Sequence, residues 1–398
     1  MYRKKILIAV IGMLSTSATF LFAQDELVKK TSENKSDSVG FQFTQIINLE
    51  RTAIENQGSA GTCWSYATNS FLESEMIKAG KQPLHLAKIF TARNSYFEKA
   101  QNYIRMGGSV NYGDGGEPHD AVNMYAKYGT MPESVYTGLI NGATKHNFNK
   151  MQKSLKAMLD SILKVPSGKV DIAWKKNFND TLDAYLGKVP ETFEYEGKTY
   201  TPLSFAKERV GLNPDDYIEF ISQNNTPYWK MAMMMIPDNW AFQWCWNIPS
   251  SDFITIIDYA LKSGYTVAWA TDVSEPYFSW PNGVAFVPEN PEKYRGRLTK
   301  EEKLFLFGNP KQEPIITAEF RQQGIENNST TDDHDMHIVG LAKDQNGKEY
   351  YIVKNSWGES NDYKGFIYVS KAYVQYKSIG VMVNKKALPK SITSKIKL

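Results

Sequence analysis

Residues 56–65 of the chain read Asn-Gln-Gly-Ser-Ala-Gly-Thr-Cys-Trp-Ser, and this stretch decides the expected fold. Its glycines and small residues allow a tight backbone turn, and the apolar spacing that follows predicts a helix over Cys63–Lys78. Cys63 is therefore expected at the amino-terminal end of a helix, where the positive end of the helix dipole favours the thiolate. The backbone N–H of Cys63 and the side chain of Gln57 can both donate to a developing oxyanion. An inert buried cysteine at a helix start is the alternative.

A cysteine nucleophile needs a base, and the base needs a group that orients it. Of the five histidines, His337 is the one expected to open a strand, in the segment Met-His-Ile-Val-Gly. Asn355 follows the next expected strand, so a hairpin would bring its amide beside the imidazole of His337. Trp357, two residues later, would shield that hydrogen bond from water. We therefore predict Cys63 as the nucleophile, His337 as the base and Asn355 as the group that orients it.

The residues around His337 also raise the alternative of a metal site, because this segment is dense in ligand-type side chains: Asp332, Asp333, His334, Asp335 and His337. The two histidines stand on a loop and a strand, and so lack the helical geometry of a zinc-protease pair. The acidic run is expected to be a solvated loop. We predict no metal and no cofactor.

The elements elsewhere in the chain indicate an α+β fold, with helices early and strands late. The apolar patterns predict further helices over 118–128, 148–162, 174–185 and 252–263, and short strands over 265–271, 337–342, 349–354, 365–370 and 379–384. The helical stretch around 140–235 interrupts this plan and is interpreted as an insertion.

Composition excludes several classes of protein. The 398 residues are 42% hydrophobic and 22% charged, which is typical of a globular protein. All of the net charge of +3 comes from the first 23 residues, and the remainder holds 43 basic and 43 acidic residues. A nucleic-acid partner is not expected, because such binders normally need an excess of Lys and Arg.

The first 23 residues have the pattern of a secretory signal peptide, a basic start and an apolar stretch ending at Ala23. We expect cleavage near Ala23, export to the periplasm or medium, and no membrane association afterwards; a membrane anchor is the alternative. Residues 24–40 are expected to be a flexible arm and residues 41–398 a single catalytic domain. Only two cysteines occur, Cys63 and Cys245, which leaves open whether they pair.

Taken together, the Gln57–Cys63 spacing, Cys63-Trp64, the strand-borne His337 and Asn355-Ser356-Trp357-Gly358 resemble the papain-like cysteine peptidases. Within that group the chain is more similar to the bleomycin hydrolase/aminopeptidase C branch. Ala60 stands where secreted papain relatives have a disulfide cysteine. The histidine lies 274 residues after the cysteine, against roughly 130–150 in papain and cathepsins, which implies large insertions. The Gly-Asp-Gly-Gly-Glu segment at 113–117 looks like a motif of the same branch.

The resemblance implies a papain-like fold with a helical half and a β-barrel-like half. It implies an aminopeptidase acting on peptide substrates, with Gln57 as an oxyanion donor. Gly115, Gly116 and Trp357 would bind substrate, and a hexameric assembly would follow from the family alone. This chain departs from the family in its short, lysine-rich carboxyl-terminal tail, which leaves open whether the tail enters the cleft. The alternatives are an endopeptidase on the same scaffold and a catalytically silent peptide-binding protein.

Overall fold

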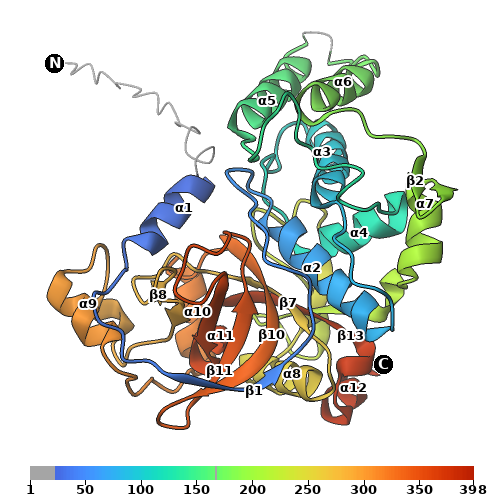
Figure 1. The fold of residues 1–398 in the computed structure, drawn as a ribbon. Helices are drawn as coiled ribbons and strands as arrows, with labels where there is room; N and C mark the ends of the chain where they lie inside the picture. Colours follow the sequence, from blue (N-terminus) through green and yellow to red (C-terminus); the bar gives the residue numbers. More distant parts are fainter. Residues whose placement is uncertain (1–22, 166–167) are drawn as a thin grey trace, which may run out of the picture.

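A computed structural model describes residues 23–165 and 168–398, and Figure 1 shows a helical half packed against a half built on a large sheet. The predicted signal peptide lies, apart from Ala23, outside the described residues. Among the residues that are described, no helix is long and apolar enough to cross a membrane. The observed division agrees with the α+β class expected from the sequence.

The helical half is built from α2 (Cys63–Lys78), α3 (Lys88–Arg105), α4 (Pro118–Tyr128), α5 (Asn149–Leu163) and α6 (Trp174–Leu186). The bounds predicted for α2 and α4 are confirmed, those for α5 differ by one residue at each end, and α6 ends one residue later than predicted. The sequence patterns did not predict α3. Its buried face carries polar and charged side chains, including Lys88, Arg93 and Lys99, so hydrophobic periodicity alone does not reveal it.

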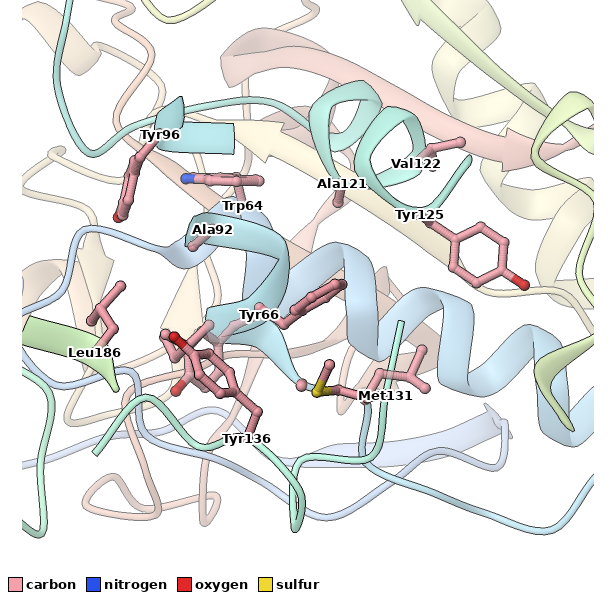
Figure 2. Packing of buried hydrophobic residues seen from close by; sticks show 14 of the residues in the cluster. Trp64, Tyr66, Ala92, Tyr96, Ala121, Val122, Tyr125, Met131, Tyr136 and Leu186 are labelled. Carbon is pink, nitrogen blue, oxygen red and sulfur yellow. The ribbon is translucent and has the colours of Figure 1, made fainter. Parts of the chain in front are cut away.

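Helix α2 lies at the centre of the molecule, and its residues from Trp64 to Met76 are all buried. Figure 2 shows part of its surroundings, with Trp64 and Tyr66 of α2 among Tyr96 of α3 and Tyr125 of α4. The other side of α2 packs against the large sheet. Burial on all sides fixes the position of the first residue of this helix, Cys63.

The large sheet holds eleven strands in the described part of the chain, and β10 lies near its middle. The strand order is β5-β6-β4-β13-β7-β10-β11-β12-β9-β8, with β1 pairing to β10. The strands are β1 (Phe43–Asn48), β4 (Tyr217–Ile221), β5 (Lys230–Met233), β6 (Trp244–Asn247), β7 (Val267–Thr271), β8 (Phe278–Ser279), β9 (Val284–Ala285), β10 (His334–Asp344), β11 (Glu349–Lys354), β12 (Phe366–Ser370) and β13 (Ser378–Asn384). Strand β10 begins three residues before the predicted start at His337, which matters for the site.

Shorter elements surround these two halves. They are the hairpin β2 (Phe193–Tyr195) and β3 (Lys198–Tyr200), and the helices α7 (Pro202–Phe205), α8 (Ser250–Lys262), α9 (Lys300–Phe307), α10 (Ala318–Glu326), α11 (Lys371–Lys377) and α12 (Lys390–Ile396). The segment expected to be a helical insertion, around 140–235, contains α5 and α6. It also contains β4 and β5, which join the main sheet.

The segment predicted to be a flexible arm, residues 24–40, is instead attached to the folded body. It contains most of α1 (Ala23–Ser32), and Leu27 of this helix is buried in the core of the sheet half. Asn34 donates to the carbonyl oxygen of Phe278 at 2.8 Å, and the backbone N–H of Ser36 donates to Asn282. The prediction was wrong because polar composition does not reveal contacts made with a distant part of the chain.

Candidate active site

The imidazole that meets Asn355 belongs to His334. Its Nε2 lies 2.8 Å from Oδ1 of Asn355, and the ring of Trp357 covers it at a centroid distance of 4.4 Å. The backbone N–H of Ser356 also donates to Asn355 Oδ1, at 2.7 Å, which fixes the amide orientation. With Nε2 held in this way, Nδ1 of His334 is buried and has no hydrogen-bond partner among the described residues. This nitrogen is therefore available to a group in the adjoining cleft.

The prediction that His337 would meet Asn355 is wrong. His337 lies opposite Lys354 in the β10–β11 pairing, and its Nδ1 lies 3.0 Å from Oγ of Ser70 on α2. Residues three apart in a strand face opposite sides of the sheet, so His334 and His337 cannot both face the cleft. Burial, followed by the charge of Lys354, holds the pKa of His337 well below its ordinary value, and the ring is neutral and structural.

A β-bulge accounts for the shift of register. Lys343 pairs with Glu349, and an unbroken ladder from that point would set Asn355 opposite His337. The register shifts by one between Ile338 and Gly340, because one extra residue is accommodated on β10. Lys354 therefore takes the place opposite His337, and Asn355 lies alongside the start of the strand.

Cys63 is the first residue of α2 and is partly exposed in a cleft of about 540 Å³ that His334 also lines. Burial, followed by the carboxylate of Asp335, raises the pKa of the Cys63 thiol well above its ordinary value. Burial lowers the pKa of His334 to about 4, against the hydrogen bond to Asn355. These shifts favour a neutral thiol beside a neutral imidazole in the free protein, in contrast to the thiolate expected from the helix position alone.

Gln57 has the arrangement expected of an oxyanion donor. Its side chain is fully buried, and its Oε1 accepts a hydrogen bond from Ser356 Oγ at 2.5 Å. Its backbone N–H donates to the carbonyl oxygen of Ser356 at 2.9 Å. These two bonds fix the amide, and Nε2 has no partner among the described residues. An unpaired buried N–H donor of this kind can stabilise a developing negative charge if the charge forms within its reach.

Gly115 and Gly116, which were predicted to bind substrate, line the cleft. A side chain at Gly115 would collide with the carboxylate of Asp238, and one at Gly116 would press on the indole of Trp64. That indole is itself held by a hydrogen bond from its Nε1 to the carbonyl oxygen of Asp114, at 2.9 Å. Glycine at these two positions therefore leaves room for the carboxylate of Asp238 and the indole of Trp64. Trp357 covers His334 and is not among the residues that line the cleft.

The cleft walls are strongly acidic. Asp114, Asp238, Asp332, Asp333 and Asp335 all line it. Helix α1 closes one side through Gln24 and Leu27. The acidic run was predicted to be a solvated loop, and the structure instead buries Asp335 and half-buries Asp332 and Asp333 against the cleft.

Sequence reasoning thus missed His334 and the acidic wall. The sequence feature that could have indicated them is Asp333-His334, just ahead of the strand predicted to begin at His337.

The two cysteines are both free, so Cys245 does not pair with Cys63. Cys245 is buried on β6, where its thiol lies 3.4 Å from Glu219. Leu398, at the end of the carboxyl-terminal tail, lines a cavity with Cys245 that shares no lining residue with the Cys63 cleft. Ile392 and Ile396 of α12 anchor the tail in the core of the sheet half.

Comparison with known proteins gives the class to which this fold and site correspond. Residues 316–397, which carry His334, Asn355 and Trp357, match the Peptidase C1-like family. The resemblance to the papain-like cysteine peptidases on the bleomycin hydrolase/aminopeptidase C branch is confirmed.

The individual relatives are distant but cover most of the chain. Aminopeptidase C of Streptococcus thermophilus is 22% identical over 89% of this chain and 85% of its own length. Cysteine proteinase 1, mitochondrial, of Saccharomyces cerevisiae is 23% identical over 94% of this chain and 82% of its own length. The crystal structure of PepW from Lactobacillus rhamnosis HN001 superposes with a TM-score of 0.71 at 21% identity, covering 94% of this chain and 91% of that one. That likeness supports the papain-like fold.

Proposed function

We propose that this protein is an exported cysteine aminopeptidase that hydrolyses peptide bonds through a thioester on Cys63. The observation that carries the proposal is the hydrogen bond from His334 to Asn355, because it leaves the other imidazole nitrogen free in the cleft that holds Cys63. The relatives named aminopeptidase support the exopeptidase part of the proposal.

In the first half of the reaction, Nδ1 of His334 accepts the thiol proton as Cys63 Sγ bonds to the substrate carbonyl carbon. Gln57 Nε2 and the Cys63 backbone N–H donate to the oxyanion. The C–N bond then breaks, and His334 gives the proton to the leaving amine. In the second half, His334 takes a proton from water, the hydroxide attacks the thioester, and the S–C bond breaks to restore the thiol.

A neutral resting pair suits this sequence, because the proton moves from sulfur to nitrogen only when a substrate is attacked. Asn355 keeps His334 in position while its charge changes, and Trp357 keeps water from their hydrogen bond. Asn355 and Trp357 are positioning residues, whereas Cys63, His334 and Gln57 touch the reacting atoms.

The test of this assignment compares two histidines and two cysteines. Cys63→Ala and His334→Ala should abolish hydrolysis of a defined peptide, because nucleophile and base act as a unit. His337→Asn and Cys245→Ser, at buried positions outside the cleft, should retain turnover once the folded fraction is normalised by circular dichroism. An inactive His337→Asn beside an active His334→Ala would refute the assignment.

Export is a separate part of the proposal and rests on the sequence pattern of residues 1–23. Expression of the full chain in a bacterial host, followed by cell fractionation and intact-mass measurement, tests it. The expected product is a periplasmic or secreted protein that begins near Gln24. A full-length cytoplasmic product would contradict export and leave the peptidase assignment in place.

An endopeptidase is the second candidate, and the position of the tail favours it. Because Leu398 lines a different cavity, its carboxylate does not stand in the cleft to limit cutting to the amino end of a substrate. The products of one peptide, free and N-acetylated, distinguish the two: an aminopeptidase releases single residues from the free form alone, whereas an endopeptidase cuts both internally.

A further inference from the structure

Three carboxylates from two parts of the chain converge beside the nucleophile: Glu117, which precedes α4, and Asp332 and Asp335 at the start of β10. One oxygen from each lies within 4.8 Å of the others. Glu117 is fully buried, and its carboxyl group meets Asp332 as a hydrogen-bonding neighbour within the cluster. Oδ2 of Asp335, which is 2% exposed, has no hydrogen-bond partner among the described residues. Buried carboxylate oxygens without partners are unusual and indicate a missing ligand.

No cation of the described chain neutralises this group. None of the three carboxylates forms an ion pair within the described ranges, 23–165 and 168–398. Lys99, a buried lysine nearby, directs its ammonium to the carbonyl oxygens of Gly113 and Gly115. Burial, followed by the charge of Asp238, raises the pKa of Asp332 to about 8. Burial and the charges of Asp332 and Asp335 raise the pKa of Glu117 well above its ordinary value.

The place of the three carboxylates relates them to the substrate. Asp332 and Asp335 line the same cleft as Cys63 and His334. Glu117 directly follows Gly115 and Gly116, which line the same cleft. A group bound among the three carboxylates would therefore belong to a substrate residue at or next to the bond that is cut.

We propose that Glu117, Asp332 and Asp335 together form a receptor for the primary ammonium group of the peptide substrate. An ammonium carries three N–H donors and a single positive charge, and it can place one donor on each carboxylate. The inference rests on the proposed peptidase function and adds the chemistry of the group that the cleft selects. It also supplies a source of amino-end recognition that does not depend on the distant carboxylate of Leu398.

Two sources can provide this ammonium, the α-amine of the substrate and a lysine side chain. The α-amine is the one that would produce aminopeptidase action. Three peptides separate the sources: Ala-Phe-Ala-Ala amide, its N-acetylated form, and N-acetyl-Lys-Phe-Ala-Ala amide. Binding to the full-length Cys63→Ala protein, measured by calorimetry, keeps recognition separate from turnover.

We expect the free peptide to bind at least about tenfold more tightly than its acetylated form, because acetylation removes the charge that the carboxylates meet. Recovered affinity in the acetylated lysine peptide would identify a side-chain ammonium as an equal ligand. Equal binding of all three peptides would overturn the proposal. A preference for the free peptide that disappears in EDTA would overturn it in favour of a divalent cation site.

Glu117→Gln, made in the Cys63→Ala background, should lower the preference for the free peptide by about tenfold. Glu75→Gln is the matched control: Glu75 is also buried, and burial raises its pKa to about 7, but it bonds Asn384 away from the cleft. An equal loss of preference in both variants would reduce the effect to general destabilisation and overturn the receptor. If the wild-type protein hydrolyses none of the three peptides while the Cys63→Ala protein still prefers the free peptide, the peptidase proposal fails and the receptor stands.

Discussion

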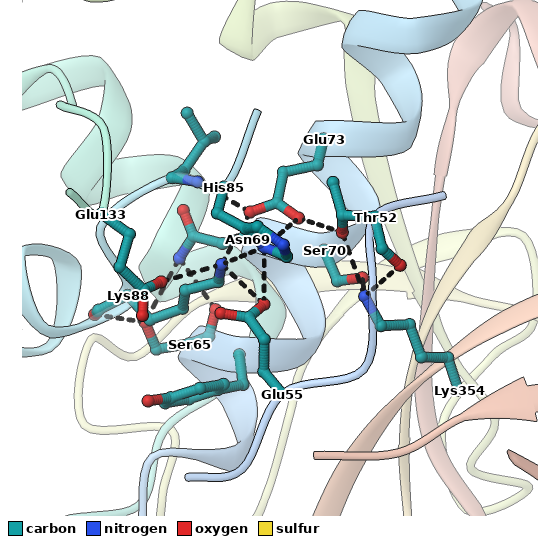
Figure 3. A network of polar contacts seen from close by, with 12 residues as sticks. Thr52, Glu55, Ser65, Asn69, Ser70, Glu73, His85, Lys88, Glu133 and Lys354 are labelled. Atoms are coloured by element: carbon teal, nitrogen blue, oxygen red, sulfur yellow. Dashed lines mark hydrogen bonds and ion pairs between the residues drawn. The ribbon is translucent and has the colours of Figure 1, made fainter. Parts of the chain in front are cut away.

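Two clusters of three carboxylates in the described part of this protein differ in whether a cation lies among them. Figure 3 shows Glu55, Glu73 and Glu133 gathered around Lys88. Their oxygens lie 2.7, 2.8 and 3.1 Å from the lysine Nζ. Glu117, Asp332 and Asp335 gather beside Cys63, and none of these carboxylates forms an ion pair with a described residue. Both clusters are largely buried, so burial alone does not explain their different electrostatics.

The Lys88 cluster demonstrates what an ammonium does among three carboxylates in this molecule. The charges of Glu73, Glu55 and Glu133 outweigh burial and raise the pKa of Lys88, so the lysine stays charged although it is 1% exposed. The charge of Lys88 and the bond to His85 hold the pKa of Glu55 below its ordinary value, against burial. In the cleft cluster burial raises the pKa of Glu117 and Asp332, and in the Lys88 cluster burial raises that of Glu133 to about 7, so the clusters differ in the cation and not in every carboxyl pKa. The first cluster is a closed structural unit, and the second is open to a ligand.

Removing the cation from the closed cluster should have the largest effect on stability. Lys88→Met leaves three buried carboxylates facing one another, and we expect the free energy of unfolding to fall by about 3–5 kcal/mol, the range for a broken buried ion pair. Urea denaturation followed by tryptophan fluorescence measures it. A loss below about 1 kcal/mol would mean that the two clusters do not differ as described.

Adding a cation to the open cluster should convert it into a closed one. Glu117→Lys places an ammonium beside Asp332 and Asp335, where it would occupy the site of the substrate amine. We expect kcat/KM for a free-amine peptide to fall by about a hundredfold, because the receptor loses a carboxylate and is filled. The melting temperature should hold or rise. Full activity in a folded Glu117→Lys protein would show that the cluster does not meet the substrate.

A substitution in the open cluster should also change how the free energy of unfolding depends on pH. The pKa of Asp332 is raised to about 8 in the folded protein, above an unfolded value near 4, so the folded state binds more protons between these limits. Its contribution to stability is therefore lost as the pH rises from about 4 to about 8. Asp332→Asn should gain stability relative to wild type across this range. Urea midpoints at pH 5 and pH 8 measure the difference, and the comparison cancels groups with the opposite trend, such as His334. A constant difference would contradict the expectation.

The smallest effect is expected at the surface. Lys127 and Glu98 form an ion pair of 2.7 Å, but the lysine side chain is 56% exposed and water screens its charge. Lys127→Ala should change the free energy of unfolding by less than about 1 kcal/mol. A loss as large as that in Lys88→Met would mean that burial is not what separates the two kinds of pair.

Much of the fold and part of the site could be predicted because they depend on local patterns. The tight turn before Cys63 and the helix that follows it are set by neighbouring residues, and both were placed correctly. The strand pairs on either side of Asn355 could be predicted from alternation and turn residues. Helix α3 could not, because its buried Lys88 and Lys99 find their partners in distant segments.

The choice between His334 and His337 depended on a feature with no clear sequence pattern. Both residues lie on β10, and the ladder from Lys343 points to His337 until the bulge shifts the register. A shift of one residue exchanges the two faces of a strand, so the prediction placed the wrong imidazole against Asn355. The acidic pocket was missed for a related reason, since Glu117 and Asp332 are 215 residues apart in the sequence.

The separation of α1 from Leu398 has a practical consequence for engineering this protein. Leu398 is half exposed at a cavity apart from the cleft, whereas Gln24 of α1 stands in the wall beside Cys63. An affinity handle or an immobilising linker attached to the carboxyl end would therefore leave the path of a peptide clear. The same handle attached at α1 would hang at the mouth of the cleft and compete with whatever enters it.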